Sequence, residues 1–178
     1  MNKAKVYPPI LLFTYNRPVH FKRTLSSLGK NNNAEKYKLI IFIDGPKTDF
    51  DRKKIKAIES FIKSNNKFKS IKVLKNKINK GLKQSIIDGV NYAFKQFENI
   101  VVLEDDIITN KYYLDFMTDS LNYYQNHPLV STVSGYSYIN VNKAFKSKVY
   151  LSQRHSSWGW GTWKKNWIKY KWNNDWIK

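Results

Sequence analysis

Three consecutive carboxylates, Glu104-Asp105-Asp106, are the residues whose types and spacing most clearly predict chemistry. They follow an apolar run at residues 100–103, which is typical of a buried parallel strand, and open α/β sheets bind ligands at the carboxyl ends of such strands. Adjacent carboxylates repel one another, and the chain has only 13 Asp and Glu against 32 Lys and Arg. Because side chains alternate along a strand, we expect Glu104 and Asp106 to face one way and Asp105 the other.

Two carboxylates on the same side of a cleft suit a hard divalent cation, Mg²⁺ or Mn²⁺, that also takes phosphate oxygens as ligands. The alternative is a solvated acidic turn that ends a strand, because short motifs also occur by chance. The sequence has no cysteine and its three histidines are scattered, which argues against a zinc site.

A second candidate site is the stretch Thr14-Tyr15-Asn16-Arg17-Pro18, which follows another apolar run. Pro18 suits the first turn of a helix, with Asn16 or Arg17 at the cap. Backbone N–H groups at a helix N-terminus together with Arg17 predict a phosphate site.

The elements that must position these residues alternate along the chain. Apolar runs predict strands at residues 10–13, 39–43, 71–74 and 100–103, and helical periodicity predicts a helix between each pair of strands. This order predicts an α/β fold with a mainly parallel central sheet and helices on both faces. Beyond the acids we expect an aromatic helix at residues 112–124 and strands at 129–133 and 149–151. Asp44-Gly45 ends the second strand, either as part of the ligand crevice or as simple turn chemistry.

All six tryptophans lie between Trp158 and Trp176. Trp163, Trp167 and Tyr170 share one face of a predicted helix with Thr162 at its N-cap. This helix either docks its aromatic side chains on the core or presents them to a sugar or to a membrane interface. Residues 156–161 place two glycines beside large indoles, which indicates a loop that approaches a ligand, and we expect Trp158 and Trp160 to stack on a sugar.

The composition limits the class of protein. At 178 residues the chain suits one domain. No apolar run approaches the roughly 20 residues that cross a bilayer, and Pro8 and Pro9 interrupt the N-terminus early, so we expect a cytoplasmic protein. The net charge of +19 fits nucleic acid, an anionic membrane surface or phosphorylated substrates, and it also fits a lysine-rich solvated face.

Together these motifs resemble the nucleotide-sugar glycosyltransferases of the GT-A fold, and within them the bacterial relatives of N-acetylglucosaminyltransferase I. The resemblance runs from about Ile10 to Trp176. It rests on five stretches in this order: Phe13-Thr14-Tyr15-Asn16-Arg17-Pro18, Asp44-Gly45, Asn79-Lys80-Gly81-Leu82, Val102-Leu103-Glu104-Asp105-Asp106 and Trp158-Gly159-Trp160. It implies a Rossmann-like GT-A fold and a transferase that uses a nucleotide-sugar donor.

The resemblance also implies roles for the residues that match the family's donor motifs. Thr14 and Tyr15 would line the base, Arg17 would contact the diphosphate, and Asp44 would hydrogen-bond the base, which is expected to be uracil. Gly81 would belong to the same donor site.

For the acidic triplet the resemblance implies three different contacts. Glu104 would touch the ribose, Asp105 the transferred sugar, and Asp106 would be the single protein ligand of Mn²⁺ or Mg²⁺. A divalent ion and a nearby arginine would neutralise the charge that develops on the leaving nucleoside diphosphate.

The segment from Trp172 to Trp176 resembles the family's tryptophan-flanked acidic pair, which makes Asp175 the expected catalytic base. Asn173 and Asn174 depart from that pattern. A carboxylate that deprotonates the incoming hydroxyl on the face opposite the leaving group would give inversion at the anomeric carbon. We expect one domain over residues 1–178 with an acceptor-side segment from about residue 150, and the chain is either truncated at its C-terminus or a minimal transferase.

The leading hypothesis is therefore a metal-dependent glycosyltransferase for a surface polysaccharide or glycolipid. Its partners would be a nucleotide sugar and a saccharide or lipid-linked acceptor, with peripheral contact at the inner face of an anionic membrane. One alternative is a basic nucleic-acid-binding module, which leaves the acidic triplet unexplained. Another is an inactive domain that only binds sugar nucleotides.

Overall fold

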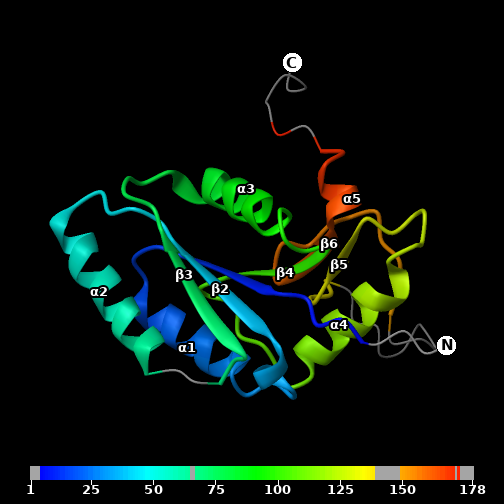
Figure 1. The fold of residues 1–178 in the computed structure, drawn as a ribbon, viewed down its shortest axis with the longest axis horizontal. Coiled ribbons are helices and arrows are strands. Elements are labelled where there is room, and N and C mark those ends of the chain that lie inside the picture. The colour runs from blue at the N-terminus through cyan, green and yellow to red at the C-terminus, as the bar shows by residue number, and fades with distance from the viewer. Residues whose placement is uncertain (1–4, 65–66, 139–148, 171, 173–178) are drawn as a thin grey trace.

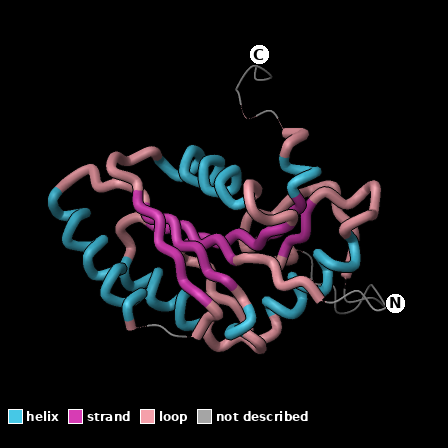
Figure 2. The backbone as a smooth tube through the Cα atoms, in the orientation of Figure 1, coloured by secondary structure: helices cyan, strands magenta, loops and turns pink. Residues whose placement is uncertain are grey.

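A six-stranded sheet in the order β3-β2-β1-β4-β6-β5 forms the centre of the molecule (Figures 1 and 2). The computed structural model describes residues 5–64, 67–138, 149–170 and 172. The strands are β1 (Ile10–Thr14), β2 (Lys38–Ile43), β3 (Ser70–Lys75), β4 (Asn99–Glu104), β5 (Thr132–Ser134) and β6 (Trp160–Trp163). The predicted α/β class with a mainly parallel sheet is confirmed.

The pairing register brings the carboxyl ends of three strands to one edge. Strand β1 lies between β2 and β4 and is parallel to both, with Thr14 opposite Ile43 and Phe13 opposite Glu104. Strand β6 is antiparallel to β4 and to β5. The residues that follow β1, β2 and β4 therefore meet at one edge, where open parallel sheets bind their ligands.

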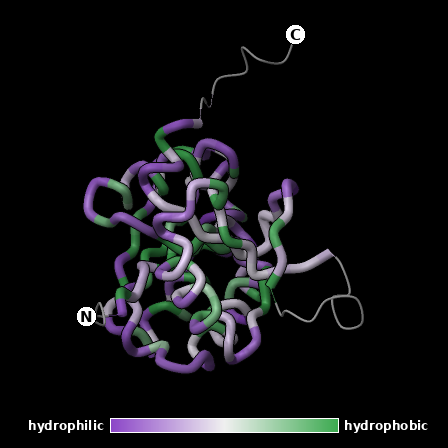
Figure 3. The backbone as a smooth tube through the Cα atoms, turned by 90° about the vertical axis from the view of Figure 1, so that its right-hand side faces the viewer, coloured by the Kyte–Doolittle hydropathy of each residue, from purple (hydrophilic) through white to green (hydrophobic). Residues whose placement is uncertain are grey.

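Helices cover both faces of the sheet, as predicted. Helices α1 (Pro18–Leu28), α2 (Asp49–Lys63) and α4 (Tyr113–Tyr124) lie on one face, and α3 (Gly81–Ala93) and α5 (Lys164–Trp167) lie on the other (Figure 1). A short 3₁₀ helix, η1 (Ala34–Lys36), precedes β2. Side chains of β1 and β4 are buried on both faces, because each face packs against helices. Figure 3 shows the most hydrophobic stretches running through the interior.

Strand β3 is less buried than its apolar run at residues 71–74 suggests. Its residues are exposed or half-buried, and it lies at the edge of the sheet beside β2 alone. Lys72 and Lys75 are exposed on it. Charged side chains on an edge strand disfavour pairing with another chain, so part of the high lysine content has a structural explanation.

The predicted helix with Thr162 at its N-cap begins one residue later than expected and is shorter, so the predicted cap is wrong. Thr162 belongs to β6, where it pairs with Ile100 and Thr132, and the Trp163 backbone is extended. Pairing with β4 and β5 overrides the local helical pattern in this segment. Helix α5 begins at Lys164 and ends at Trp167.

The two remaining predicted strands also change. The strand expected at residues 129–133 is the shorter β5, Thr132–Ser134, and residues 149–151 form no strand. Apolar side chains in both stretches produced a strand-like pattern, but Leu129 and Leu151 are largely exposed, so burial does not support an extended strand there.

Candidate active site

The residues that follow β1, β2 and β4 contact one another at the carboxyl edge of the sheet. The Thr14 hydroxyl donates to Oδ2 of Asp105 at 2.7 Å, and the backbone N–H of Asp44 donates to the Thr14 carbonyl at 3.0 Å. The Thr24 hydroxyl of α1 donates to the Asp105 carbonyl at 2.8 Å. Hydrogen bonds therefore connect the loops after β1, β2 and β4 at the edge where the sequence analysis expected a ligand to bind.

Arg17 bridges the two aspartates of the acidic triplet. Its backbone caps α1, which begins at Pro18, and its side chain makes no cap bond to that helix. Nη1 contacts Oδ2 of Asp106 at 2.9 Å, and Nη2 pairs with Oδ1 of Asp105. Burial opposes the ionised guanidinium, but the charges of Asp105 and Asp106 prevail and raise the pKa of Arg17 above its usual value.

The expected alternation of the acidic side chains does not extend beyond the strand. Strand β4 ends at Glu104, and Asp105 and Asp106 lie in a turn that brings both carboxylates to Arg17. Asp105 is 2% exposed, whereas the Asp106 side chain is 43% exposed. Burial raises the pKa of the Glu104 carboxyl, and the charges of Asp106 and Asp105 raise it further.

The donor atoms present here fit a cation that shares its ligands with phosphate. Within the described part of the chain, no group of three or more His, Cys, Asp or Glu side chains could hold a metal ion. An accessible carboxylate such as that of Asp106 fits the chemistry of Mg²⁺ or Mn²⁺, which bind one or two carboxylates together with substrate phosphates and waters.

Asp44 holds together the loop that leads into α3. Its Oδ1 accepts hydrogen bonds from Gly45 N–H at 2.9 Å and from Asn76 Nδ2 at 3.1 Å, and its Oδ2 accepts one from Gly81 N–H at 2.9 Å. The N–H of Lys80 also donates to this carboxylate. The carboxylate of Asp44 therefore organises the turn, as one of the two interpretations from the sequence predicts, and Asp44 lies at the carboxyl edge of the sheet.

Two glycines, one after β2 and one at the start of α3, are required by the backbone. A Cβ on Gly45 would lie 2.2 Å from the backbone carbon of Ile78, so the loop crosses too closely for any side chain. Gly81 has a φ of 77° and begins α3. Asp44 also lines a cavity of about 300 Å³ between β2, β3 and α3, together with Phe42 and Asn76.

Asp51 is the site residue that the sequence reasoning missed. Its carboxylate accepts hydrogen bonds from the Tyr15 hydroxyl at 2.8 Å, from Asn16 Nδ2 at 2.6 Å and from the backbone N–H groups of Lys47 and Thr48. The spacing of Thr48 and Asp51 is that of a capping box, so the sequence could have predicted its place in α2. Its bonds to Tyr15 and Asn16, which join the loops after β1 and β2, are tertiary contacts.

We expect Asp51→Asn to lower the melting temperature at neutral pH by about 3 °C or more, because the amide cannot accept the same set of hydrogen bonds. The hydrogen bonds from Asn16 and Tyr15, with those from Thr48, lower the pKa of Asp51 well below its ordinary value of 3.8. A lowered pKa stabilises the fold fully above that ordinary value, and this stabilisation is lost as the pH falls through the lower folded value.

The measurement is thermal unfolding of both proteins from neutral pH to below pH 3.8, where the difference in melting temperature is expected to shrink. Asp49→Asn is the matched control, since Asp49 lies in the same helical turn with its side chain 97% exposed. A difference that does not depend on pH would contradict the assigned role of the carboxylate.

Exposed aromatic rings gather beside the acidic end of β4. Val102 and Ser134 both pair with Trp160, so Trp158 and Tyr136 lie just beyond the strand ends at the same edge as Glu104. The Trp158 ring is 54% exposed and lies 4.6 Å from the Tyr136 ring between centroids. These positions are suitable for a stacking surface.

The prediction that Trp160 stacks on a sugar is wrong. Trp160 is 8% exposed, belongs to β6, and stacks on Trp167 with ring centroids 6.1 Å apart. The indole Nε1 of Trp163 donates to the Leu121 carbonyl at 3.1 Å, and that of Trp167 donates to Asn91 Oδ1 at 2.8 Å. These three indoles are therefore core side chains, which agrees with the docking alternative.

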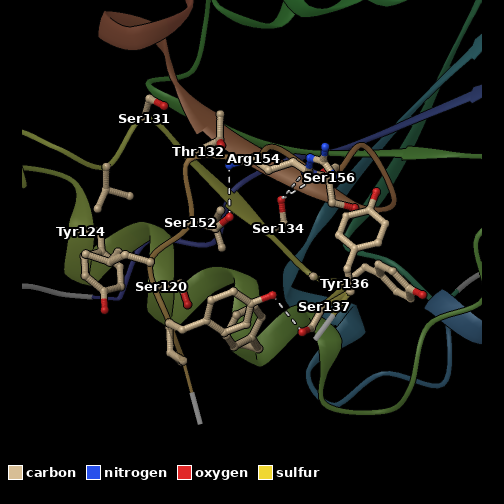
Figure 4. A pocket seen from close by; sticks show the side chains of 18 of the residues that line it. Ser120, Tyr124, Ser131, Thr132, Ser134, Tyr136, Ser137, Ser152, Arg154 and Ser156 are labelled. Atoms are coloured by element: carbon tan, nitrogen blue, oxygen red, sulfur yellow. Dashed lines mark hydrogen bonds between the residues drawn. The ribbon is translucent and has the colours of Figure 1, made fainter. Parts of the chain in front are cut away.

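A cavity of about 720 Å³ lies between α4, β5 and the segment that precedes β6 (Figure 4). Hydroxyl-bearing and aromatic side chains predominate in its lining, among them Ser120, Tyr124, Ser134 and Tyr136. None of the predicted donor or metal residues lines it. Its chemistry would suit a saccharide, but the charged groups of the acidic triplet lie outside it.

The predicted catalytic base, Asp175, is not among the residues that the structure describes.

Comparison with known proteins supports the family. The fold is similar to that of S. aureus TarS, at 18% sequence identity and a TM-score of 0.50 over 67% of this chain and 20% of that one. It is also similar to the mannosyltransferase PcManGT from Pyrobaculum calidifontis in complex with GDP-Man and Mn²⁺, at 14% identity and a TM-score of 0.55 over 72% of this chain and 34% of that one. The chain thus spans about a fifth and about a third of these two proteins.

A search of curated proteins found no match. The model of the family described as glycosyl transferase family 2 matches residues 10–176, which is nearly the whole chain and includes every predicted site residue. The chain belongs to glycosyl transferase family 2.

Proposed function

We propose that this chain transfers a sugar from a nucleoside-diphosphate donor, UDP-sugar, to a hydroxyl of a saccharide or lipid-linked acceptor, with Mn²⁺ or Mg²⁺ and with inversion. The observation that carries the proposal is the convergence of Arg17, Asp105 and Asp106 at the carboxyl edge of a sheet whose sequence matches the family. Residues 1–178 would act as one unit, with an acceptor side that begins near residue 150.

The chemistry requires that negative charge on the departing nucleoside diphosphate be neutralised. A bound Mn²⁺ or Mg²⁺ would supply part of this neutralisation as a Lewis acid, held by Asp106. Arg17 would donate hydrogen bonds to the diphosphate from its guanidinium fork, which matches phosphate geometry. The contact between Arg17 and Asp106, at 2.9 Å, supports this pairing of roles because both groups reach the same point.

The remaining donor residues surround that point. Thr14 and Tyr15 would line the base, and Asp44 and Gly81 would shape the loop beside it, with Asp44 contacting a uracil. Glu104 would contact the ribose and Asp105 the transferred sugar. The support for this arrangement is that Thr14 and Asp105 are hydrogen-bonded and that Asp44 follows β2 beside Thr14.

The acceptor would approach from the side of the exposed aromatic rings, where Trp158 would stack on its sugar. Asp175 would remove the proton from the attacking hydroxyl as a general base. None of the helices in the described ranges is long and apolar enough to cross a membrane. Peripheral contact with an anionic membrane would bring a lipid-linked acceptor to the site, and the net charge of +19 supports this part of the proposal.

Substitutions of two neighbouring tryptophans separate acceptor binding from folding. Trp158→Ala is expected to raise the acceptor KM by about tenfold, since the comparable stacking of a nucleobase on an aromatic ring contributes on the order of 1–3 kcal/mol. Its exposed ring means that the melting temperature should change little. Trp160→Ala should instead destabilise the fold by about 3–5 kcal/mol, because it removes a buried aromatic ring.

Steady-state kinetics with a varied acceptor, together with urea unfolding, check both expectations. An unchanged acceptor KM in a folded Trp158→Ala protein would remove Trp158 from the acceptor site. A Trp160→Ala protein as stable as the wild type would contradict the core position of Trp160.

Calorimetry tests the donor site. UDP, GDP, ADP and CDP are each titrated into the protein with Mn²⁺ and with EDTA. We expect UDP to bind most tightly and only in the presence of the cation. Equal binding of all four nucleotides in EDTA would contradict the proposed donor site. A cation-dependent preference for another nucleotide would change only the assignment of uracil as the nucleobase.

A further inference from the structure

We infer that Arg17 is a positioning residue that makes cation binding at Asp106 depend on the nucleotide. The inference rests on the proposed function, because Asp106 is the cation ligand in that proposal. It adds that Arg17 competes with the cation for the Asp106 carboxylate and releases it when a diphosphate is present.

The two contacts of the guanidinium have very different surroundings. Nη2 pairs with Asp105, which is 2% exposed and also accepts a hydrogen bond from the Thr14 hydroxyl. Nη1 holds Asp106 at 2.9 Å, and the Asp106 side chain is 43% exposed. Loss of the contact with Asp105 would leave a buried charge unpaired, whereas loss of the contact with Asp106 would leave its carboxylate open to solvent. Arg17 is therefore anchored by Asp105 and can exchange its partner only at Asp106.

A cation that takes the Asp106 oxygen bound by Nη1 must displace that nitrogen, and a cation on the other oxygen still lies close to the positive charge of Arg17. Because Arg17 cannot leave Asp105 without a large penalty, this repulsion between like charges remains. The Asp106 carboxylate thus has a weakened affinity for a cation on its own.

A nucleoside diphosphate removes the conflict. Its oxygens can bind the cation and at the same time accept hydrogen bonds from the released Nη1, since a guanidinium fork can hold a carboxylate with one nitrogen and a phosphate with the other. The negative charge of the diphosphate then lies between the two positive groups. Cation and nucleotide should therefore each increase the affinity of the other by the same factor, as linkage requires.

The test measures Mn²⁺ binding by electron paramagnetic resonance, from the loss of the free-ion signal, without any turnover. Arg17→Gln removes the competing charge, so Mn²⁺ alone should bind on the order of tenfold more tightly than to the wild type. Arg17→Lys keeps the charge but replaces the planar two-nitrogen fork with a single ammonium, which holds the two carboxylates less well, so it should show a smaller increase. Arg23→Gln is the matched control, since Arg23 is exposed on the same helix, and should leave the affinity unchanged.

A second arm repeats the titrations with the nucleoside diphosphate that the calorimetric panel selects. The nucleotide should raise the Mn²⁺ affinity of the wild type by on the order of tenfold and that of Arg17→Gln by less. Equal or weaker binding of Mn²⁺ alone to Arg17→Gln would overturn the inference. If Arg17→Gln does not fold, an Arg17→Lys protein that binds Mn²⁺ no better than the wild type would overturn it equally.

Asp106→Asn separates this inference from the proposed function. If Asp106→Asn loses Mn²⁺ binding while Arg17→Gln resembles the wild type, the cation site stands and the role of Arg17 is wrong. If Asp106→Asn binds Mn²⁺ and nucleotide like the wild type, the proposed cation site itself is wrong, and the inference about Arg17 fails with it.

Discussion

Asp106→Asn is expected to reduce cation-dependent nucleotide affinity by at least about 100-fold, since it removes the one charged ligand that we assign to the cation. The asparagine side chain has almost the same shape, but its neutral amide is a far weaker ligand for a hard cation than a carboxylate. The measurement is calorimetric titration of the preferred nucleotide with Mn²⁺, compared with the same titration in EDTA.

The fold should tolerate this substitution. The Asp106 side chain is 43% exposed, and exposed ion pairs contribute only about 0–1 kcal/mol to stability. Thermal unfolding should therefore be nearly unchanged, which distinguishes a lost ligand from a damaged protein. Asp119→Asn is the control, because Asp119 is also an exposed carboxylate in an ion pair, with Lys5 at 2.7 Å. Undiminished Mn²⁺-dependent binding in Asp106→Asn would remove this residue from the site.

Asp175→Asn is expected to lower kcat by on the order of 10²–10⁴-fold, the usual contribution of a positioned general base. An amide cannot accept the proton that the acceptor hydroxyl loses as it attacks the anomeric carbon. Nucleotide binding with Mn²⁺ should be unchanged, since this residue is assigned to the acceptor and not to the donor. Initial rates at saturating donor, together with the donor Kd, measure the two effects separately.

Asn174→Ala is the control for this second substitution, because it changes the neighbouring residue of the same tryptophan-flanked segment. It should leave kcat within a fewfold of the wild type. Full activity in Asp175→Asn would end the assignment of the base, whereas a parallel loss of donor binding would place the residue in the donor site. For Asp106→Asn we expect the opposite: the affinity for the nucleotide with Mn²⁺ falls, whereas in Asp175→Asn that affinity is kept and kcat falls.

The position of the candidate site at the carboxyl edge of the sheet was largely predictable, because it depends on which residues follow the strands. A buried apolar run followed by acids or by a Pro-capped helix places its last residues at the carboxyl edge, whatever the details of packing. The family resemblance assigned Thr14, Asp44 and Asp105 to one site, and Thr14 contacts each of the other two. The contact between Arg17 and Asp106 follows from the same rule, since both residues come directly after neighbouring strands.

The C-terminal tryptophans were less predictable, because a pattern of large apolar residues does not say what they pack against. Trp163 has helical spacing to Trp167, yet it belongs to a strand because β4 offers it a backbone partner. The indoles of Trp160 and Trp163 are then buried by the same pairing, whereas Trp158, beyond the end of β6, keeps its ring exposed.

What the sequence determined by itself is the order of strands and helices, the acidic end of β4 and the loop that carries Arg17, because each depends on neighbouring residues along the chain. What only the tertiary structure decided is which partner each polar group finds. Asp51 holds Tyr15 and Asn16 from another loop, and Arg17 divides its guanidinium between a buried and an exposed carboxylate. The physical reason is that these bonds join residues that are distant in sequence, so their geometry exists only once the sheet has brought its loops together.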